Sequence, residues 1–193
     1  MKIGVLALQG AFAEHEKVLE QLGAKCIELR QARDLGESYD ALVLPGGEST
    51  VQGKLLKELS MFDTIKSQIQ NGMPVLATCA GAILLAETID GQMKGQPEQY
   101  FGTIPMCIKR NAYGRQLGSF HTEASVVGIG TVPMTFIRAP YIASVGNGVE
   151  VLAVVEERIV GVKYKNQMAF SFHPELDPDM RIHKTFLSMI SNV

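Results

Sequence analysis

The first half of the chain alternates short apolar runs with longer stretches in which apolar residues recur at helical spacing. The apolar runs have the length of buried strands, and the amphipathic stretches have the length of helices. Strands that alternate with helices are joined by right-handed crossovers, which makes the sheet mainly parallel. The pattern therefore predicts strands at residues 3–8, 26–29, 41–44 and 74–77. It predicts helices at residues 11–22 and 62–70, and a third helix that is capped by Ser49 or Thr50 and ends at residue 59.

The second half of the chain changes to short strand-like runs separated by turn signals such as Gly146-Asn147-Gly148. These runs predict antiparallel ribbons that are added to the parallel sheet. A polar, glycine-rich segment at residues 91–102 is expected to be a loop, and an amphipathic segment at residues 179–190 is expected to be a closing helix. The strand-like runs cover residues 104–109, 119–127, 135–137, 150–155, 159–164 and 168–172.

Length and composition favour one globular domain. A chain of 193 residues, with 46% hydrophobic and 20% charged residues, can bury a core on both faces of a sheet. The expected fold is an α/β domain over residues 1–193, a three-layer sandwich with a mainly parallel central sheet and added antiparallel strands. A net charge of -2 gives no reason to expect a nucleic acid or a membrane as a partner.

The apolar start of the chain is short and runs into an acidic segment, so it predicts a buried first strand and not a signal peptide. No apolar stretch is long enough to span a bilayer. The cysteines Cys26, Cys79 and Cys107 are odd in number and widely spaced. This spacing argues against disulfides and favours a reducing cytoplasm. Cysteine and histidine show no metal-ligand spacing, so no metal is expected.

One cysteine lies where an apolar strand runs directly into an apolar helix. In the segment VLATCAGAILL, residues 75–85, small residues surround Cys79. A nucleophile elbow needs small neighbours, because its turn is tight and strained. Such a turn exposes the sulfur at the carboxyl end of the sheet and at a helix N-terminus, where thiolate is favoured. The alternative is a buried structural cysteine, which is the role we expect for Cys26 and Cys107.

A cysteine nucleophile needs a nearby base, and the chain offers four histidines. His15 lies in the segment AFAEHEKVLE, where we expect it on a solvated helix face. His183 is expected to have the same status in the closing helix. The position of His121, after a strand-like run, leaves its role open.

The fourth histidine, His173, ends the apolar run at residues 168–172 and is followed by Pro174 and Glu175. A histidine at the carboxyl end of a strand lies at the same sheet edge as the elbow. Glu175 can fold back to hydrogen-bond the imidazole, which would fix its tautomer and stabilise the imidazolium. The alternative is a polar surface turn that ends a strand.

The segment PGGEST, residues 45–50, lies between a predicted buried strand and a predicted helix. Its glycines allow backbone N–H groups to approach a ligand closely. One of them, together with the N–H of Ala80, could form an oxyanion hole. The alternatives are a phosphate-type loop or a plain connection, and the missing GKS/T ending argues against a nucleotide P-loop.

Six collinear stretches carry a resemblance to the class I, triad-type glutamine amidotransferases, and among these to the glutaminase subunits of pyridoxal 5'-phosphate synthases. The resemblance spans nearly the whole chain and implies the flavodoxin-like fold of that class. The stretches are GVLALQGAFAEH (residues 4–15), LPGGEST (44–50), ATCAG (77–81), KRNAYGRQLGSF (109–120), FIRAP (136–140) and FHPEL (172–176).

The resemblance implies that Cys79 attacks the side-chain amide carbon of glutamine, that His173 moves the protons and that Glu175 orients His173. The backbone N–H groups of Gly47 and Ala80 would bind the oxyanion. An arginine suits the substrate carboxylate because its guanidinium bonds in a bidentate manner. The alternative for the two arginines is an ion pair that pins a loop. The implied contacts to glutamine are Gly47, Glu48, Ser49, Arg110, Ile137 and Arg138.

The resemblance also implies a partner and no cofactor. The partner is a separate synthase subunit, a (β/α)8 barrel that assembles into rings and takes the ammonia through an internal tunnel. It would join the ammonia to ribose 5-phosphate and glyceraldehyde 3-phosphate, giving pyridoxal 5'-phosphate (vitamin B6) as a product. Docking of the partner would complete the oxyanion hole, which prevents waste of free ammonia.

Two positions depart from the family pattern: His121 stands where relatives usually carry an acidic residue, and Ala77 where many have glycine. Three alternatives stay open, namely a glutaminase of another synthase, a cysteine peptidase or redox chaperone, and a catalytically silent subunit. The RNAYGRQ and FIRAP stretches argue against the first, and the late His-Pro-Glu segment argues against the second. The intact Cys79, His173 and Glu175 argue against the third.

Overall fold

The computed structural model describes residues 1–91, 100–110 and 119–190. The helices in this part are α1 (Phe12–Gln21), α2 (Ser49–Glu58), α3 (Phe62–Gln70), α4 (Ala80–Leu85) and α5 (Arg181–Ile190), with short 3-10 turns η1 (Ala32–Gly36) and η2 (Pro174–Leu176). The strands are β1 (Lys2–Leu6), β2 (Lys25–Leu29), β3 (Ala41–Leu44), β4 (Val75–Thr78), β5 (Ala86–Ile89), β6 (Ile104–Lys109), β7 (Ser119–Val126), β8 (Gly130–Ile137), β9 (Tyr141–Val145), β10 (Glu150–Val155), β11 (Arg158–Tyr164) and β12 (Gln167–Phe170).

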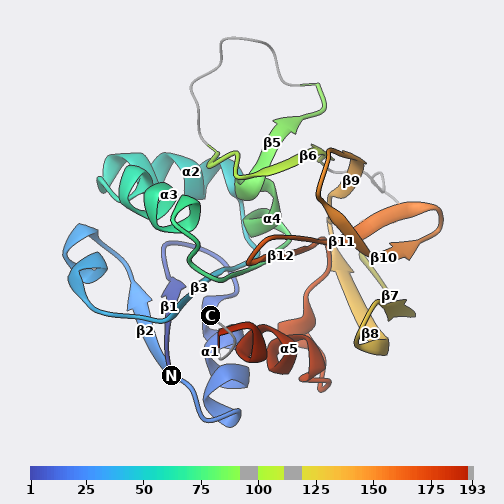
Figure 1. Cartoon of the computed structure of the whole chain (residues 1–193), viewed down its shortest axis with the longest axis horizontal. Coiled ribbons are helices and arrows are strands. Elements are labelled where there is room, and N and C mark those ends of the chain that lie inside the picture. Colours follow the sequence, from blue (N-terminus) through green and yellow to red (C-terminus); the bar gives the residue numbers. More distant parts are fainter. Residues whose placement is uncertain (92–99, 111–118, 191–193) are drawn as a thin grey trace.

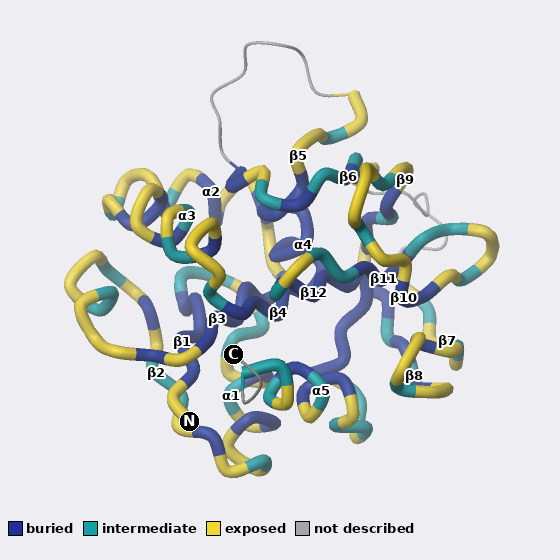
Figure 2. The backbone as a smooth tube through the Cα atoms, viewed as in Figure 1, coloured by how far each residue is buried: buried dark blue, intermediate teal, exposed yellow. Residues whose placement is uncertain are grey.

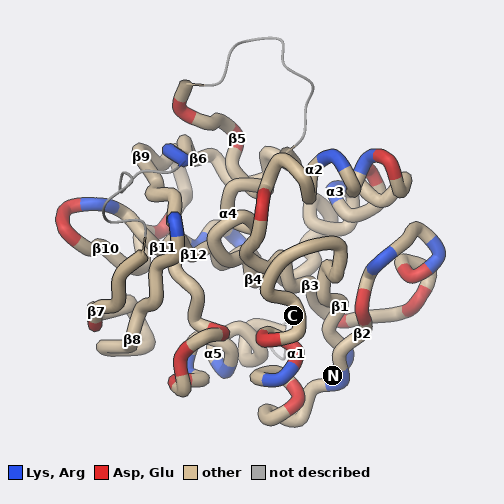
Figure 3. The backbone as a smooth tube through the Cα atoms, turned by 180° about the vertical axis from the view of Figure 1, so that it is seen from behind, with Lys and Arg blue, Asp and Glu red and all other residues tan. Residues whose placement is uncertain are grey.

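The described strands form one mixed sheet whose main path runs β2-β1-β3-β4-β12-β11-β10-β7-β8 (Figure 1). The first five strands of this path are parallel to one another. Every residue of β3, β4 and β12 is buried, because helices cover the sheet on both faces. No Asp, Glu, Lys or Arg lies on these three strands, and Figure 3 shows the charges on the helices, the loops and the outer strands.

The helices divide between the two faces of the parallel strands. Leu42 and Leu44 of β3 point into a core that also contains residues of α2, α3 and α4. Ala41 and Val43, at the alternate positions, point into a second core with Leu19 of α1 and residues of α5. Figure 1 shows α1 and α5 on one side of the sheet and α2, α3 and α4 on the other. The expected three-layer α/β architecture is therefore confirmed.

The antiparallel strands lie beyond β12, as expected. β11 pairs with β12 and β10, and β7 and β8 form a long hairpin at the end of the path. β5, β6 and β9 form a smaller ribbon, which joins the sheet through the pairing of β9 with β11. This second half differs from the first in that most of its strands have exposed positions (Figure 2).

Most predicted elements agree with the structure to within two residues, but two strands were missed and two predictions were wrong. β5 and β9 were missed, because both are short and their mixed burial gives no clear alternation. β8 begins five residues before the predicted run. Neither Ser49 nor Thr50 caps α2, since Ser49 is already its first residue and Glu48 holds the cap position without a side-chain bond.

The closing helix is confirmed as α5. The predicted loop at residues 91–102 falls mostly outside the described residues, as does much of the KRNAYGRQLGSF stretch after Arg110. Over the described ranges, no helix is long and apolar enough to cross a membrane.

Candidate active site

Cys79 lies in a sharp turn between β4 and α4, at the carboxyl end of the parallel strands. Its backbone φ of 48° is positive, which strains a residue with a side chain. The Cys79 N–H donates to the carbonyl of Phe170 at the end of β12, at 2.8 Å. A Cβ on Gly81 would lie 2.0 Å from the carbonyl oxygen of Leu44, so the turn packs directly onto β3. The residues around Cys79 must therefore be small, because larger side chains would collide with β3. The predicted strand–cysteine–helix turn is present.

His173 follows β12 by three residues and lies beside the cysteine turn. The predicted strand continued to residue 172, whereas β12 ends at Phe170, so His173 belongs to the connection after the strand. The backbone N–H of His173 donates to the carbonyl of Thr135 on β8 at 2.8 Å, which anchors this connection to the antiparallel half. A Cβ on Gly46 would lie 2.3 Å from His173 Cε1 and 3.3 Å from Cys79 Cβ. Only a glycine at this position leaves room for the imidazole next to the sulfur.

Glu175 holds the far side of the His173 imidazole. His173 Nδ1 lies 2.7 Å from Glu175 Oε1, and both side chains are almost completely buried. Burial disfavours the imidazolium, but hydrogen bonds with Cys79 and Glu175 outweigh burial and raise the pKa of His173 to about 10. Burial would likewise raise the pKa of Glu175, yet the imidazoles of His15 and His173 lower it. The cluster therefore favours an ionised carboxylate and a protonated imidazole beside the sulfur.

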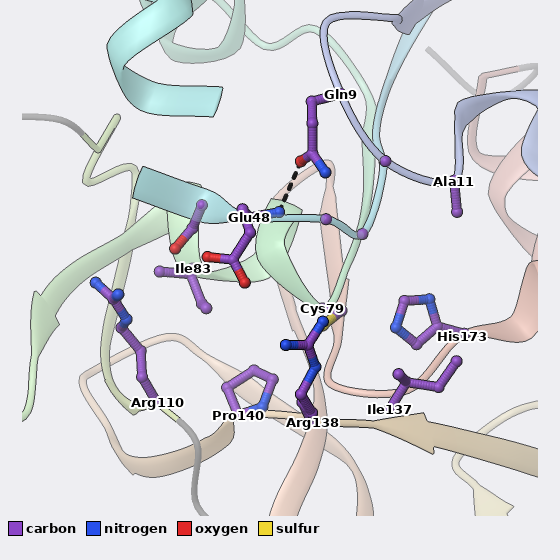
Figure 4. A pocket seen from close by; sticks show the side chains of 14 residues that line it. Gln9, Ala11, Glu48, Cys79, Ile83, Arg110, Ile137, Arg138, Pro140 and His173 are labelled. Carbon is purple, nitrogen blue, oxygen red and sulfur yellow. Dashed lines mark hydrogen bonds between the residues drawn. The ribbon is translucent and has the colours of Figure 1, made fainter. Parts of the chain in front are cut away.

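These groups border a cavity of about 220 Å³ (Figure 4). This volume suits a small metabolite better than a nucleotide or a peptide. The lining combines the turn after β1, the glycine loop after β3, the cysteine turn and the segment after β8. The residues that line it are Gln9, Gly10, Ala11, Gly46, Gly47, Glu48, Ser49, Cys79, Ile83, Arg110, Ile137, Arg138, Pro140 and His173.

The structure brings nearly all the predicted site residues to this cavity. Gly47, Glu48, Ser49, Arg110, Ile137 and Arg138 line it together with Cys79 and His173. Ala80 is buried directly after Cys79 and does not belong to the lining, and Glu175 lies behind His173.

The described residues do not include an ion-pair partner for either of the two arginines, which was their alternative role. Among the described residues, neither Arg110 nor Arg138 has a carboxylate within salt-bridge distance. Arg110 donates to the hydroxyl groups of Tyr100 at 3.1 Å and Thr50 at 3.2 Å. Arg138 has a positive φ of 43°, which places its backbone in a strained conformation at the rim of the cavity. Within the described residues, both cations therefore face the cavity without a carboxylate partner.

Two glutamines that the sequence did not single out hold the loops of the cavity. Gln9 Oε1 accepts a hydrogen bond from the N–H of Glu48 at 2.7 Å, which Figure 4 shows as a dashed line. The buried Gln52 donates to the carbonyls of Gln9 at 2.9 Å and Pro45 at 3.2 Å. The turn after β1 is thereby fixed to the glycine loop. For Gln9, the sequence signal of this role was its position before Gly10, shortly after the first strand.

The expectation that His15 and His183 lie on solvated helix faces was wrong. Both side chains are fully buried, and His15 contacts both Thr78 and Glu175. His15 shares the apolar face of α1 with Val18 and Leu19, three and four residues further on. This helical spacing indicates burial of His15, but the prediction followed the polarity of histidine and placed it in solvent. His121 is exposed and hydrogen-bonds Thr135.

Among the described residues, no group of three His, Cys, Asp or Glu side chains could hold a metal ion. All three cysteines are free thiols. The chemistry available at this cavity is that of a cysteine beside a histidine–carboxylate pair, with arginines nearby to bind an anion.

Comparison with solved structures defines the class to which this fold belongs. A structure described as a glutamine amidotransferase superposes with a TM-score of 0.91 at 42% identity, covering 98% of both chains. A putative GMP synthase protein from Thermoplasma acidophilum shares the fold, with a TM-score of 0.71 at 20% identity over 100% of this chain and 94% of that chain. The fold is therefore that of the class I glutamine amidotransferases.

The family can be stated more narrowly. The sequence profile of the SNO glutamine amidotransferase family matches residues 5–192, and the chain belongs to this family. A protein of Desulfitobacterium hafniense named pyridoxal 5'-phosphate synthase subunit PdxT is 59% identical, over 100% of this chain and 94% of its own length. The protein of the same name from Streptococcus pneumoniae is 54% identical, over 98% and 97%.

Proposed function

We propose that this chain hydrolyses L-glutamine to L-glutamate and ammonia, and that it supplies the ammonia to a pyridoxal 5'-phosphate synthase. The observation that carries the catalytic part is the placement of Cys79 at a small cavity beside His173, whose Nδ1 lies 2.7 Å from Glu175. The synthase part rests on the family and on relatives that share more than half of the residues.

In the first half-reaction the Cys79 thiolate attacks the side-chain amide carbon of glutamine. The carbonyl oxygen becomes an oxyanion, which the backbone N–H groups of Gly47 and Ala80 stabilise. The imidazolium of His173 gives its proton to the amide nitrogen, the carbon–nitrogen bond breaks, and ammonia leaves. The product on the enzyme is a glutamyl thioester of Cys79.

In the second half-reaction water hydrolyses the thioester. Neutral His173 accepts a proton from the water as it attacks, and the thioester carbon–sulfur bond breaks to release glutamate and regenerate the thiolate–imidazolium pair. Glu175 keeps Nδ1 protonated, so that Nε2 faces the reaction. This chemistry needs no cofactor.

Substrate binding is assigned to the remaining lining residues. Arg110 and Arg138 suit the α-carboxylate, because a guanidinium binds a carboxylate in a bidentate manner. Glu48 suits the α-ammonium group, while Gly47, Ser49 and Ile137 surround the rest of the side chain. The described part of the chain leaves both arginines without a carboxylate partner, which supports this assignment.

The partner is a synthase subunit of barrel type, arranged in rings, that takes up ammonia through a tunnel. It combines ammonia with ribose 5-phosphate and glyceraldehyde 3-phosphate. Its docking completes the oxyanion hole, so that ammonia is released only when a consumer is bound. Three free thiols fit a reducing cytoplasm as the place of this reaction.

The first experiment measures glutamate release from L-glutamine by the chain alone and with a pyridoxal phosphate synthase subunit from the same source. We expect slow release alone and fast release in the complex. Equal rates would refute the gating by the partner. No release in either case would favour a silent stabilising subunit or a glutaminase of another synthase.

The nucleophile is tested with Cys79→Ala in the complex, and Cys107→Ala serves as a control because Cys107 is a free thiol away from the cavity. Cys79→Ala should abolish glutamate release and still bind the partner, while Cys107→Ala should keep the full rate. Added ammonium salt should restore pyridoxal phosphate formation with Cys79→Ala. Residual glutamate release at a comparable rate would refute the assignment of Cys79.

A further inference from the structure

Behind Glu175, on the side away from the cavity, lies a buried pair of histidines that the chemistry above does not use. His15 comes from α1 and His183 from α5, the two helices that cover the same face of the sheet (Figure 1). Both side chains are fully buried. His15 Nδ1 lies 3.0 Å from His183 Nε2, so the two rings share one hydrogen bond.

The other nitrogen of His15 faces the catalytic cluster. His15 Nε2 lies 3.0 Å from the hydroxyl of Thr78 and 3.3 Å from Glu175 Oε2. Thr78 directly precedes Cys79, and its hydroxyl accepts a hydrogen bond from the N–H of Gly46 at 3.1 Å. One imidazole therefore touches the cysteine turn and the carboxylate, and reaches the glycine loop through a single hydroxyl.

The protons of this cluster can be assigned from its contacts. Glu175 Oε1 faces the Nδ1 of His173, while Oε2 has no hydrogen-bond partner of good geometry within the described ranges. If His15 carried its proton on Nδ1, a nitrogen lone pair would face this carboxylate oxygen at 3.3 Å. With the proton on Nε2, the N–H faces two oxygens, and Nδ1 accepts from the Nε2–H of His183. The second arrangement avoids the repulsion.

Both histidines are held neutral. Burial lowers the pKa of His15, although the charge of Glu175 acts in the opposite direction. Burial also lowers the pKa of His183 to about 3. A neutral imidazole can donate from Nε2 without bringing a second positive charge next to the imidazolium of His173. Such a group stabilises the carboxylate and leaves the charge of the Glu175–His173 pair unaltered.

We propose that His15 is a positioning residue of the glutaminase: its Nε2–H, 3.3 Å from Glu175 Oε2, restrains this oxygen electrostatically, and His183 fixes the tautomer of His15 that makes this possible. This inference rests on the proposed function. A carboxylate held only at one oxygen can rotate about its terminal bond, and the Nδ1 of His173 then loses its partner. With Oε1 bonded to His173 and Oε2 attracted to the Nε2–H of His15, Glu175 keeps His173 aimed at Cys79 throughout both half-reactions.

The activity test uses the complex with the synthase subunit and two substitutions at one site. His15→Leu removes both nitrogens, whereas His15→Gln keeps an amide N–H near the position of Nε2. We expect His15→Leu to lower kcat about 10- to 100-fold with a KM for glutamine within about twofold of the wild type, and His15→Gln to recover most of the rate. Leu19→Ala, a truncation of a buried residue on the same helix, controls for loss of packing and should keep kcat.

Three results of this test would overturn the proposal: an unchanged kcat in folded His15→Leu, a loss confined to KM, or a His15→Gln variant as slow as His15→Leu. A wild-type complex that released no glutamate would instead refute the proposed function. The two failures are therefore distinguishable.

A second test does not depend on activity or on folding of a variant. In the full chain labelled with nitrogen-15 in its histidines, the ring nitrogen shifts report which nitrogen carries the proton. We expect neutral His15 and neutral His183, both protonated on Nε2, at pH 7. A proton on Nδ1 of His15, or a charged His15, would refute the inference even if the enzyme is active.

Discussion

The parallel and antiparallel halves of the sheet place different demands on their residues. In β3, β4 and β12 every position is buried, whereas exposed and half-buried positions alternate along most of β7 (Figure 2). Buried strands meet neighbours on both faces, so a change of one methyl group has no space to expand into. The proposed catalytic cluster lies at the edge of this crowded half, while the antiparallel half contributes the segment with Arg138. The positions of the side chains in this cluster are therefore set by burial on both faces of the sheet.

The glycines show the same difference. In the parallel half Gly46 and Gly81 provide space, since a Cβ at either position would collide with neighbouring atoms. At the tip of the β7–β8 hairpin, Gly128 has no atom within 4 Å of its would-be Cβ, but its φ is +77°. There the requirement is only conformational. Substitutions of these glycines by alanine test the comparison directly.

The largest effect is expected for Gly81→Ala. Its Cβ would lie 2.0 Å from a backbone oxygen of Leu44, and backbone cannot move aside as a flexible side chain can. We expect a loss of about 3 kcal/mol in the free energy of unfolding, measured by denaturant titration. Gly36→Ala is the control, because Gly36 has neither a close neighbour nor a positive φ, and it should change stability by less than about 0.5 kcal/mol. Equal effects of the two substitutions would contradict the crowding of the cysteine turn.

Gly46→Ala should act on catalysis. Its Cβ would lie 2.3 Å from His173 Cε1, so the imidazole must move away from Cys79. A displacement of this kind costs roughly 100-fold in rate. We expect kcat for glutamate release in the complex to fall by about that factor, while the chain still folds and binds its partner. A full rate would show that His173 has another productive position.

Acid should destabilise the protein through its buried histidines. The pKa of His183 falls from 6.5 in the unfolded chain to about 3 in the fold, and burial lowers that of His15 as well. Between pH 3 and 6.5 the unfolded state binds more protons, so stability decreases as the pH falls through this window. For His183 alone, the loss between pH 7 and pH 5 is about 2 kcal/mol.

Unfolding titrations at several pH values check this prediction. His183→Gln should flatten the pH dependence relative to the wild type. A slope that persists in His183→Gln would assign the acid sensitivity to other groups.

The smallest effect is expected for Gly128→Ala in the antiparallel half. A left-handed backbone costs a residue with a side chain about 1 kcal/mol, and no clash adds to this cost. Thermal unfolding should show this modest loss, with kcat unaltered. A loss as large as that of Gly81→Ala would mean that the two halves do not differ in the way proposed.

Local pattern was sufficient for much of the fold. The period of the apolar residues identified the buried strands β1 to β4 and the helices between them, because two-sided burial leaves a continuous apolar run. It failed for β5 and β9, which are short ribbons with mixed exposure, since such strands are stabilised by pairing with β6 and β11 rather than by their own pattern.

The candidate site divides in the same way. The sequence by itself determined the tight turn at Cys79, because small residues around it are a local requirement. It also determined the contact between His173 and Glu175, because a spacing of two residues suffices for the carboxylate to fold back. Only the tertiary structure decided that His15 and His183 are buried behind Glu175. Their partners are up to 168 residues away along the chain, and a polar side chain reveals its burial only when the groups that satisfy it have been brought together.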